Sequence, residues 1–206
     1  MKNANKLTIL FMAILVVGAG AAYLWQMNLG PFGGGRVAGV RSGHLRVDHH
    51  HEPMNHLDLL LSYRGGISYN FYGRQAHVFI ARYERDELVF HELVSGISTV
   101  EAHQISGSMI WGVTAEDGMP RELRVRVGIA GGMSFGHIDF SQIGFSEPAF
   151  HTGAQNTTQD TRIEPGERYV LHFWQTGTQW WADADVFSPE RLRESEQTLI
   201  LYIVFE

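Results

Sequence analysis

Cysteine is absent from the 206-residue chain, and lysine occurs only at Lys2 and Lys6. Without cysteine, the protein forms no disulfide, uses no thiol nucleophile and holds no Cys-ligated zinc. Without lysine beyond residue 6, the rest of the chain forms no lysine Schiff base. These absences exclude several covalent chemistries before any motif is considered.

Basic residues are also too few and too scattered for nucleic-acid binding. From Arg36 onward the chain carries 14 arginines against 22 acidic residues, which leaves a net charge of −8. A domain of this charge repels phosphate backbones unless its basic residues cluster, and no run of them does. We therefore expect no nucleic-acid partner.

The N-terminal part contains one long stretch without charge, from Leu7 to Trp25. As a helix, a stretch of this length rises ~28 Å, close to the ~30 Å hydrocarbon thickness of a bilayer. Two lysines precede it, and the positive-inside bias places such a basic tip in the cytoplasm. We predict a cytoplasmic tip over residues 1–6 and a transmembrane signal-anchor helix over residues 7–27, with the remainder of the chain outside.

The alternative is a cleaved signal peptide and a secreted mature protein. Leu7 to Val17 is a suitable signal-peptide hydrophobic region, and the small residues near Ala21 form an acceptable cleavage site. The apolar stretch continues past that site to Trp25, which favours the uncleaved anchor. Both alternatives export everything that follows.

Residues 28–43 are rich in glycine, with six glycines and one proline in this segment. Such a composition is typical of flexible linkers. We predict a Gly-rich tether that holds the following extracytoplasmic domain, residues 44–206, near the membrane without fixing its orientation.

Beyond the tether, β-branched and aromatic runs recur between turn signals, as in all-β folds. In Leu123–Ile129 apolar residues alternate with arginines, which predicts a strand with one buried face. Leu199–Phe205 is apolar on both faces, which is typical of a strand covered on both sides. Only Pro189–Ser195 has a helical pattern. The other predicted strands are Leu57–Tyr63, Ile67–Tyr72, Ala76–Tyr83, Leu88–Val94, Ser108–Thr114, Met133–Phe140 and Tyr169–Thr176.

This number of strands favours two packed sheets over one open sheet. Gly65-Gly66 and Gly131-Gly132 are predicted to be hairpin turns, since glycine supplies the positive φ that such turns need. Glu164–Tyr169 resembles the corner that leads into a late strand of immunoglobulin-like domains. The predicted fold is all-β: a two-sheet antiparallel β-sandwich, immunoglobulin-like or jelly-roll, preceded by one N-terminal transmembrane helix.

Histidines are concentrated at the start of the predicted domain. Imidazole and carboxylate groups suit zinc, copper or nickel, so a divalent transition metal is the one cofactor that the sequence offers. The favoured interpretation is a solvated loop or edge strand that binds metal only weakly, so we expect no cofactor, and a metal site is the alternative. The candidate metal ligands are His44, His49, His51 and His56.

Tryptophans near the C-terminus are the candidate contact residues for a partner. Trp180 and Trp181 are adjacent, so in a strand they face opposite sides of the sheet and at least one is a candidate for exposure. Exposed aromatic rings stack on sugars or anchor partner proteins, whereas core packing is the alternative role. The candidate ligand-binding residues are Trp174, Trp180 and Trp181.

The sequence contains no coherent catalytic set. Ser134 lies in a G-x-S-x-G pattern, but serine hydrolases need that serine on a strand-to-helix turn, and a strand pattern follows it here. The pairs Glu101/His103 and His137/Asp139 are typical of surface hydrogen bonds. We therefore expect a non-enzymatic, membrane-tethered module that contacts a protein or a glycan. A metal-binding protein and, less favoured, a hydrolase are the alternatives.

Overall fold

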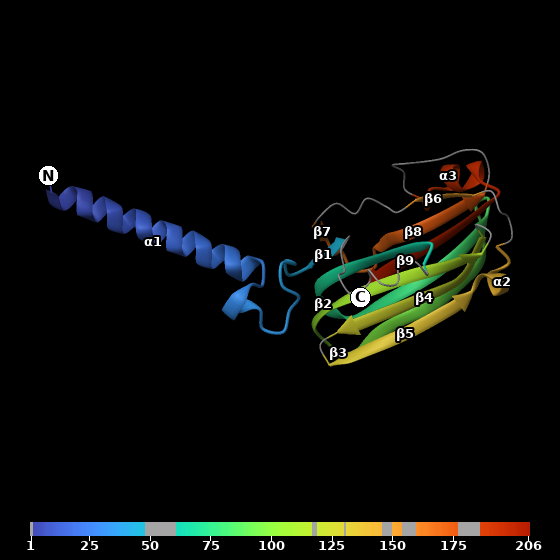
Figure 1. Ribbon diagram of the computed structural model, residues 1–206, viewed down its shortest axis with the longest axis horizontal. Helices are drawn as coiled ribbons and strands as arrows, with labels where there is room; N and C mark the ends of the chain where they lie inside the picture. Colours follow the sequence, from blue (N-terminus) through green and yellow to red (C-terminus); the bar gives the residue numbers. More distant parts are fainter. Residues whose placement is uncertain are drawn as a thin grey trace.

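The computed structural model of the chain has one long N-terminal helix followed by an antiparallel β domain (Figure 1). It describes residues 2–47, 61–116, 119–129, 131–145, 150–153, 160–176 and 186–206. The helices are α1 (Lys2–Gln26), a 3-10 turn (Gly30–Phe32), α2 (Phe140–Ile143) and α3 (Pro189–Glu194). The strands are β1 (His44–Val47), β2 (Tyr63–Glu84), β3 (Glu87–Glu116), β4 (Met119–Ile129), β5 (Gly132–Asp139), β6 (Phe150–Gly153), β7 (Thr161–Arg162), β8 (Arg168–Thr176) and β9 (Gln197–Phe205).

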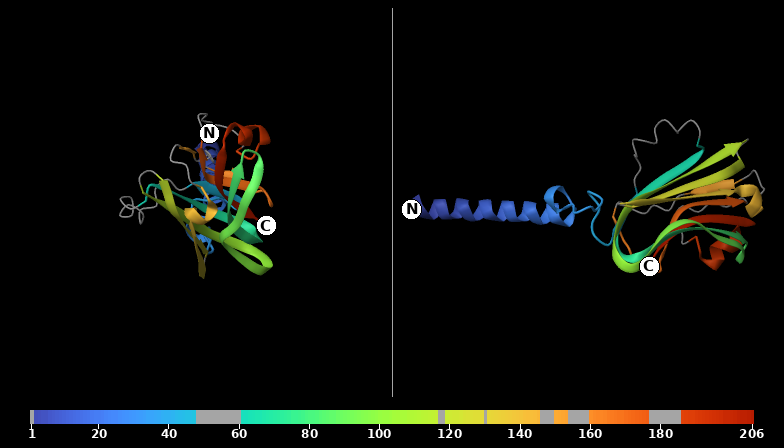
Figure 2. Two further views of the ribbon diagram at one scale, coloured as in Figure 1. Left: turned by 90° about the vertical axis from the view of Figure 1, so that its right-hand side faces the viewer. Right: turned by 90° about the horizontal axis from the view of Figure 1, so that it is seen from below.

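Hydrogen bonds join these strands into a single sheet in the order β5-β4-β3-β2-β9-β8-β6, with β1 paired to β2 and β7 paired to β1. Two strands dominate it, because β2 has 22 residues and β3 has 30. They form one long hairpin that bends at its middle, so the two halves of the sheet face each other (Figure 2). The sheet therefore differs from the two separate sheets that we predicted.

The bend is where the two strands of the hairpin lose their regular pairing. Opposite Arg74 of β2, β3 inserts residues 99–102, which have no partner in the register. A Cβ atom at Gly73 would overlap the Phe71 ring and the carbonyl oxygen of Glu206. Glycine at this position thus allows the C-terminus to pass close to the bend.

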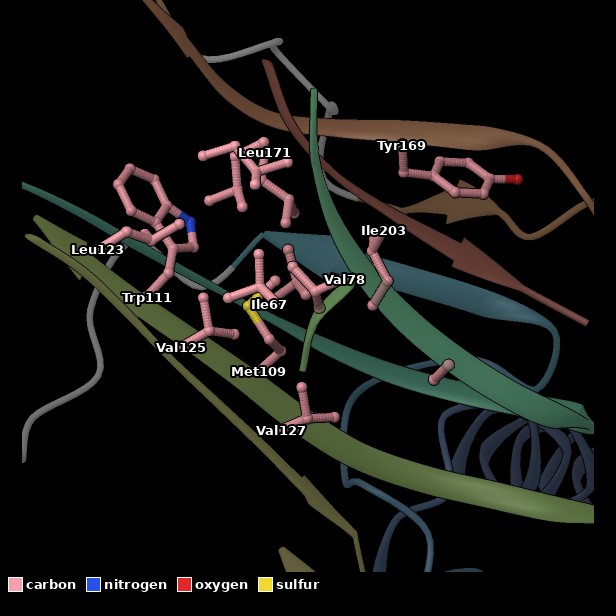
Figure 3. Packing of buried hydrophobic residues seen from close by; sticks show 14 of the residues in the cluster. Ile67, Val78, Met109, Trp111, Leu123, Val125, Val127, Tyr169, Leu171 and Ile203 are labelled. Atoms are coloured by element: carbon pink, nitrogen blue, oxygen red, sulfur yellow. The ribbon is translucent and has the colours of Figure 1, made fainter. Parts of the chain in front are cut away.

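The main core lies between the facing halves of the sheet (Figure 3). Ile67 and Val125 contribute from the first half, and Val78 and Ile203 contribute from the second. Each of these side chains is at most 3% exposed. Burial of apolar surface on this scale is the main stabilising term of such a domain.

Alternation along β4 follows the prediction. Leu123, Val125 and Val127 are buried, whereas Arg124 and Arg126 are exposed. Strand side chains point to opposite faces in turn, so the arginines remain in water while the aliphatic side chains enter the core.

The prediction that β9 is covered on both faces is confirmed. Leu199 and Leu201 face the main core, while Ile200 belongs to a second, smaller cluster on the outer face. Leu192 of α3 packs into that second cluster. The short helix predicted near the C-terminus therefore serves to cover part of the sheet.

The prediction of a turn at Gly65-Gly66 is wrong. Both glycines lie inside β2 and pair with β3. A Cβ atom at Gly65 would come within 2.8 Å of the Trp111 indole, so the absence of a side chain makes room for that ring. The turn predicted at Gly131-Gly132 is confirmed, since Gly131 has φ +95° between β4 and β5.

Candidate functional site

Helix α1 is long and apolar enough to cross a membrane over the 19 residues Thr8–Gln26. No part of that span is buried inside the structure. Ile9 and Val16, which share one side of the helix, are each 69% exposed, and Val17, about 100° further round, is 71% exposed. A helix that is apolar all round needs an apolar environment, and near an N-terminus both a membrane anchor and a signal sequence have these properties.

The segment between α1 and β1 is held against the β domain, in contrast to the flexible tether that we predicted. The side chain of Asn28 donates to the carbonyl oxygen of Val40 at 2.5 Å. Asn70 of β2 accepts from the backbone NH of Val37 at 2.9 Å and donates to the carbonyl oxygens of Val37 and Val40 at 3.0 and 2.6 Å. Both asparagines are buried. We call residues 27–43 the anchor junction.

The glycines of the anchor junction support tight turns. Gly39 has φ +76°, and its backbone NH donates to the carbonyl oxygen of Met27 at 2.8 Å. Gly43 has φ +75° and donates to the carbonyl oxygen of Asn70 at 2.7 Å. Because such φ values are strained for other residues, the glycine content reflects turn geometry here.

The outer face of the second half of the sheet carries stacked rings from three neighbouring strands. Phe79 of β2, His91 of β3 and Tyr202 of β9 have ring centroids 5.1–6.2 Å apart and interplanar angles of 3–24°. His91 Nε2 and Tyr202 Oη share a hydrogen bond of 2.7 Å. Phe187 meets Tyr202 edge-on at 5.2 Å. Aromatic pairs of this kind are worth ~0.5–1.5 kcal/mol beyond the area they bury.

Exposed aliphatic side chains border these rings. Leu93 pairs with Phe79 and Leu88 pairs with Tyr83 across the β2–β3 ladder, and directly paired residues share one face of a sheet. Leu88 is 50% exposed and Leu93 is 48% exposed. The outer face is thus apolar up to its solvent-exposed border.

A cation completes this surface. The guanidinium of Arg168 lies 4.8 Å from the ring centroid of Phe187 and 5.7 Å from that of Tyr202. These distances lie within the range of cation–π attraction. We call the following set the aromatic face: Phe79, Tyr83, Leu88, His91, Leu93, Arg168, Phe187 and Tyr202.

Trp174, one of the candidate contact residues, is fully buried in the main core. Its indole packs 4.5 Å from the ring of His172, which also lies 4.8 Å from Trp111. Burial lowers the pKa of His172 to about 3, so its ring is neutral at physiological pH. Trp174 is therefore a core residue and presents no ring to the surface. Trp180 and Trp181 lie outside the described residues.

Of the candidate metal ligands, only His44 lies within the described residues. Its Nδ1 shares a hydrogen bond of 3.0 Å with the carbonyl oxygen of Ser42. His49, His51 and His56 lie outside the described residues. Within the part of the chain that the structure describes, no three His, Asp or Glu side chains form a group able to hold a metal ion.

The residues of the hydrolase alternative have structural partners. Ser134 lies inside β5, where its Oγ accepts a hydrogen bond from Ser95 Oγ at 3.0 Å. Asp139 accepts from the backbone NH of Ser141 at 2.8 Å and caps α2. Hydrogen bonding from Ser141, through its side chain first and its backbone NH second, lowers the pKa of Asp139. His103 Nδ1 is bonded to the backbone carbonyl of Glu101 at 3.1 Å. These contacts stabilise strands and a helix start.

Sequence reasoning missed the aromatic face because its residues come from four distant segments. One signal was present in Ala76–Tyr83, where Val78 and Ile80 face the core and Phe79 and Tyr83 occupy the opposite face. A strand that is apolar on both faces either has a cover on each or presents one apolar face to a partner.

Comparison with known proteins found no match for this chain among family models, curated proteins or solved structures. The geometry of the described residues is therefore the basis for a functional assignment.

Proposed function

We propose that the chain is a membrane-anchored, extracytoplasmic β-sandwich domain that binds a protein partner through the aromatic face and catalyses no reaction. The observation that carries the proposal is the exposed apolar border at Leu88 and Leu93 beside the stacked rings. Apolar patches with a polar or charged rim are typical of protein–protein contact sites.

Anchoring is supported by the exposure of α1. The Thr8–Gln26 span is uncovered by the rest of the structure, and a bilayer provides the apolar environment that the span needs. The orientation rests on Lys2 and Lys6, which favour a cytoplasmic N-terminus. The alternative is cleavage near Ala21, which would release the same domain outside the cell.

The assignment as a β-sandwich is supported by the position of the core. The main core lies between two facing halves of the sheet, as in sandwiches, although β2 and β3 run through both halves. In this proposal the fold is a sandwich made from one bent sheet.

The geometry of the rings favours a protein over a glycan. Sugars bind to the open faces of aromatic rings, but Phe79, His91 and Tyr202 stack on one another at small interplanar angles. Tyr202 is buried and Phe79 is partly buried, so the exposed side chains of this surface are Leu88, Leu93, His91 and Arg168. That combination suits an apolar or aromatic anchor residue of a partner, with an acidic group beside it.

Site-specific photo-cross-linking tests this proposal. A photoreactive amino acid would replace Leu93 in the full chain, in membranes of the cells that naturally make it. The matched control would replace Phe135, which is 68% exposed on β5 in the other half of the sheet. We expect one discrete cross-linked protein from position 93 and none from position 135.

A second experiment tests whether the cross-linked protein binds through the aromatic face. With purified full chain in detergent, Leu93→Asp should weaken binding of that protein at least tenfold, or ~1.4 kcal/mol, and Phe135→Asp should leave it unchanged. Equal cross-linking at both positions, or none at position 93, would contradict the proposal. Glycan binding that Leu93→Asp abolishes would show that the partner is a carbohydrate.

A further inference from the structure

The anchor junction leaves few free residues between α1 and the β domain. Asn28 lies two residues beyond the end of α1 and is bound to Val40, which is bound in turn to Asn70. Arg36 adds a hydrogen bond of 3.1 Å to Asn28 Oδ1. The junction therefore couples the direction of α1 to the direction of β2, whereas a flexible tether would allow the domain to tumble.

This coupling determines which end of the domain faces α1. Asn70 lies three residues before Gly73, where β2 bends. Along a strand three residues span roughly 10 Å. Figure 2 shows in its right-hand view that the bend of the β2–β3 hairpin lies at the end of the domain nearest α1. We call residues 72–74 and 98–103 the proximal bend.

The proximal bend presents side chains of the kinds found at bilayer surfaces. Val100 is 94% exposed and Tyr72 is 68% exposed. Arg74, which lies opposite residues 99–102, is also exposed, as is Glu101 next to Val100. Aliphatic side chains enter the headgroup region, tyrosine rings prefer that depth, and arginine reaches lipid phosphates.

Val100 is held in this exposed position. Thr99 Oγ1 lies 3.2 Å from the carbonyl oxygen of Arg74 and 2.9 Å from that of Glu101, and its single proton is shared between these two acceptors. These hydrogen bonds fix the backbone on either side of Val100 and join the two strands of the bend. The valine is thus presented by an ordered turn.

We infer that the proximal bend contacts the headgroup region of the bilayer that α1 crosses, so that the domain stands on the membrane in one orientation. This inference rests on the proposed membrane anchoring. It adds a second lipid contact, made by the β domain itself, and it leaves the aromatic face on the outer surface of the sheet free for a partner.

Spin labels can measure this contact, because the chain has no native cysteine. The full chain would be reconstituted in vesicles of phosphatidylcholine and phosphatidylglycerol, with one nitroxide at Val100→Cys. Collision with oxygen reports lipid, and collision with a water-soluble nickel chelate reports solvent. Leu88→Cys is the control, since Leu88 is exposed and apolar next to the turn at the opposite end of the same hairpin.

We expect several-fold less collision with the nickel chelate at position 100 than at position 88, with high collision with oxygen at position 100. Equal and high nickel collision at both positions would overturn the inference. Low collision with both reagents at position 100 would also overturn it, because the bend would then be covered by protein.

A third label at Val16→Cys, in the middle of α1, separates the two proposals. If position 16 reports lipid and position 100 reports solvent, the anchor stands and the contact of the bend fails. If position 16 reports solvent, the proposed anchoring itself fails. In an Asn70→Ala background, position 100 should lose its protection from the nickel chelate while position 16 keeps its lipid signal.

Discussion

Helix α1 and strand β9 are both predominantly apolar and have opposite surroundings. In β9, Leu199, Leu201 and Ile203 are completely buried. In α1, Leu15 is 51% exposed and Val17 is 71% exposed. Side chains pack against β9 on both faces of the sheet, whereas no described part of the chain covers the helix.

This difference shows what hydropathy alone leaves open. An apolar segment must leave water, but its sequence does not say whether protein or lipid replaces the water. For β9 the covering groups are the main core on one side and the second cluster around α3 on the other. For α1 we propose lipid, and each of the following predictions tests one side of the comparison.

The largest expected effect comes from one charge placed in each region. Leu201→Asp puts a carboxylate into the main core, at a cost of several kcal/mol against a total stability of about 5–15 kcal/mol. We expect this variant to unfold the β domain. Leu15→Asp should leave the thermal unfolding of the domain unchanged in detergent, while membrane insertion becomes less favourable by about 2.5–3.5 kcal/mol. Thermal unfolding in detergent and membrane flotation measure the two outcomes, and destabilisation of the domain by Leu15→Asp would contradict the comparison.

The buried side of the comparison also predicts a pH dependence. Burial holds the pKa of His172 at about 3, below its ordinary value of 6.5. Between these values the unfolded chain binds a proton that the folded chain excludes, so stability falls as pH decreases through this window, by at most ~1.4 kcal/mol per pH unit. His172→Phe should reduce this slope in denaturant unfolding followed from pH 7 to pH 4.

The control for this pH dependence is His103→Gln, because His103 is exposed on the surface of β3. Its free energy of unfolding should keep the pH slope of the unsubstituted protein, with a constant offset from the lost hydrogen bond to Glu101. If the free energy of unfolding has the same pH slope in His172→Phe as in the unsubstituted protein, then burial in the core does not prevent protonation of His172.

A smaller effect is expected where the two regions join. Asn70→Ala removes three hydrogen bonds to Val37 and Val40 and leaves the backbone NH of Val37 without its partner, while the Val40 carbonyl keeps the hydrogen bond from Asn28; we expect a cost of about 1–3 kcal/mol. We expect faster amide hydrogen exchange over residues 36–43 and an unchanged exchange rate in β9. Faster exchange throughout the domain would contradict a local role for Asn70.

The smallest effect is expected on the outer face of β9. Tyr202→Phe removes the hydrogen bond to His91 and keeps the stacked ring, which should cost about 0.5–1.5 kcal/mol in unfolding free energy. Tyr72→Phe serves as the control, since Tyr72 is 68% exposed, and its stability should be unchanged. Equal losses in both variants would mean that the hydrogen bond contributes nothing measurable.

Local patterns predicted the elements whose contacts are local or whose periodicity is regular. The alternation around Val125 predicted β4, the apolar run at Leu199–Phe205 predicted a doubly covered strand, and the short pattern beginning at Pro189 predicted α3. The gap between the predicted strands Ala76–Tyr83 and Leu88–Val94 coincides with the observed turn, where Arg85 has a left-handed φ of +55°.

The length of the β2–β3 hairpin could not be predicted, because it depends on contacts between distant residues. Gly65 has the local signature of a turn, and only the Trp111 ring opposite explains a glycine within a strand. The anchor junction was predicted to be flexible from its glycines, because the asparagine that fixes it, Asn70, lies in a different element. The aromatic face escaped prediction for the same reason, since its rings meet only in the folded sheet.

The central claim is that α1 crosses a bilayer and leaves the β domain outside the cytoplasm. The direct test is a single cysteine at Phe135, exposed on β5, probed with a membrane-impermeant maleimide on intact cells that express the otherwise cysteine-free chain. The account predicts labelling of a membrane-bound protein before lysis. Labelling only after the cells are lysed, or a labelled protein that remains soluble with its N-terminal helix intact, would contradict it.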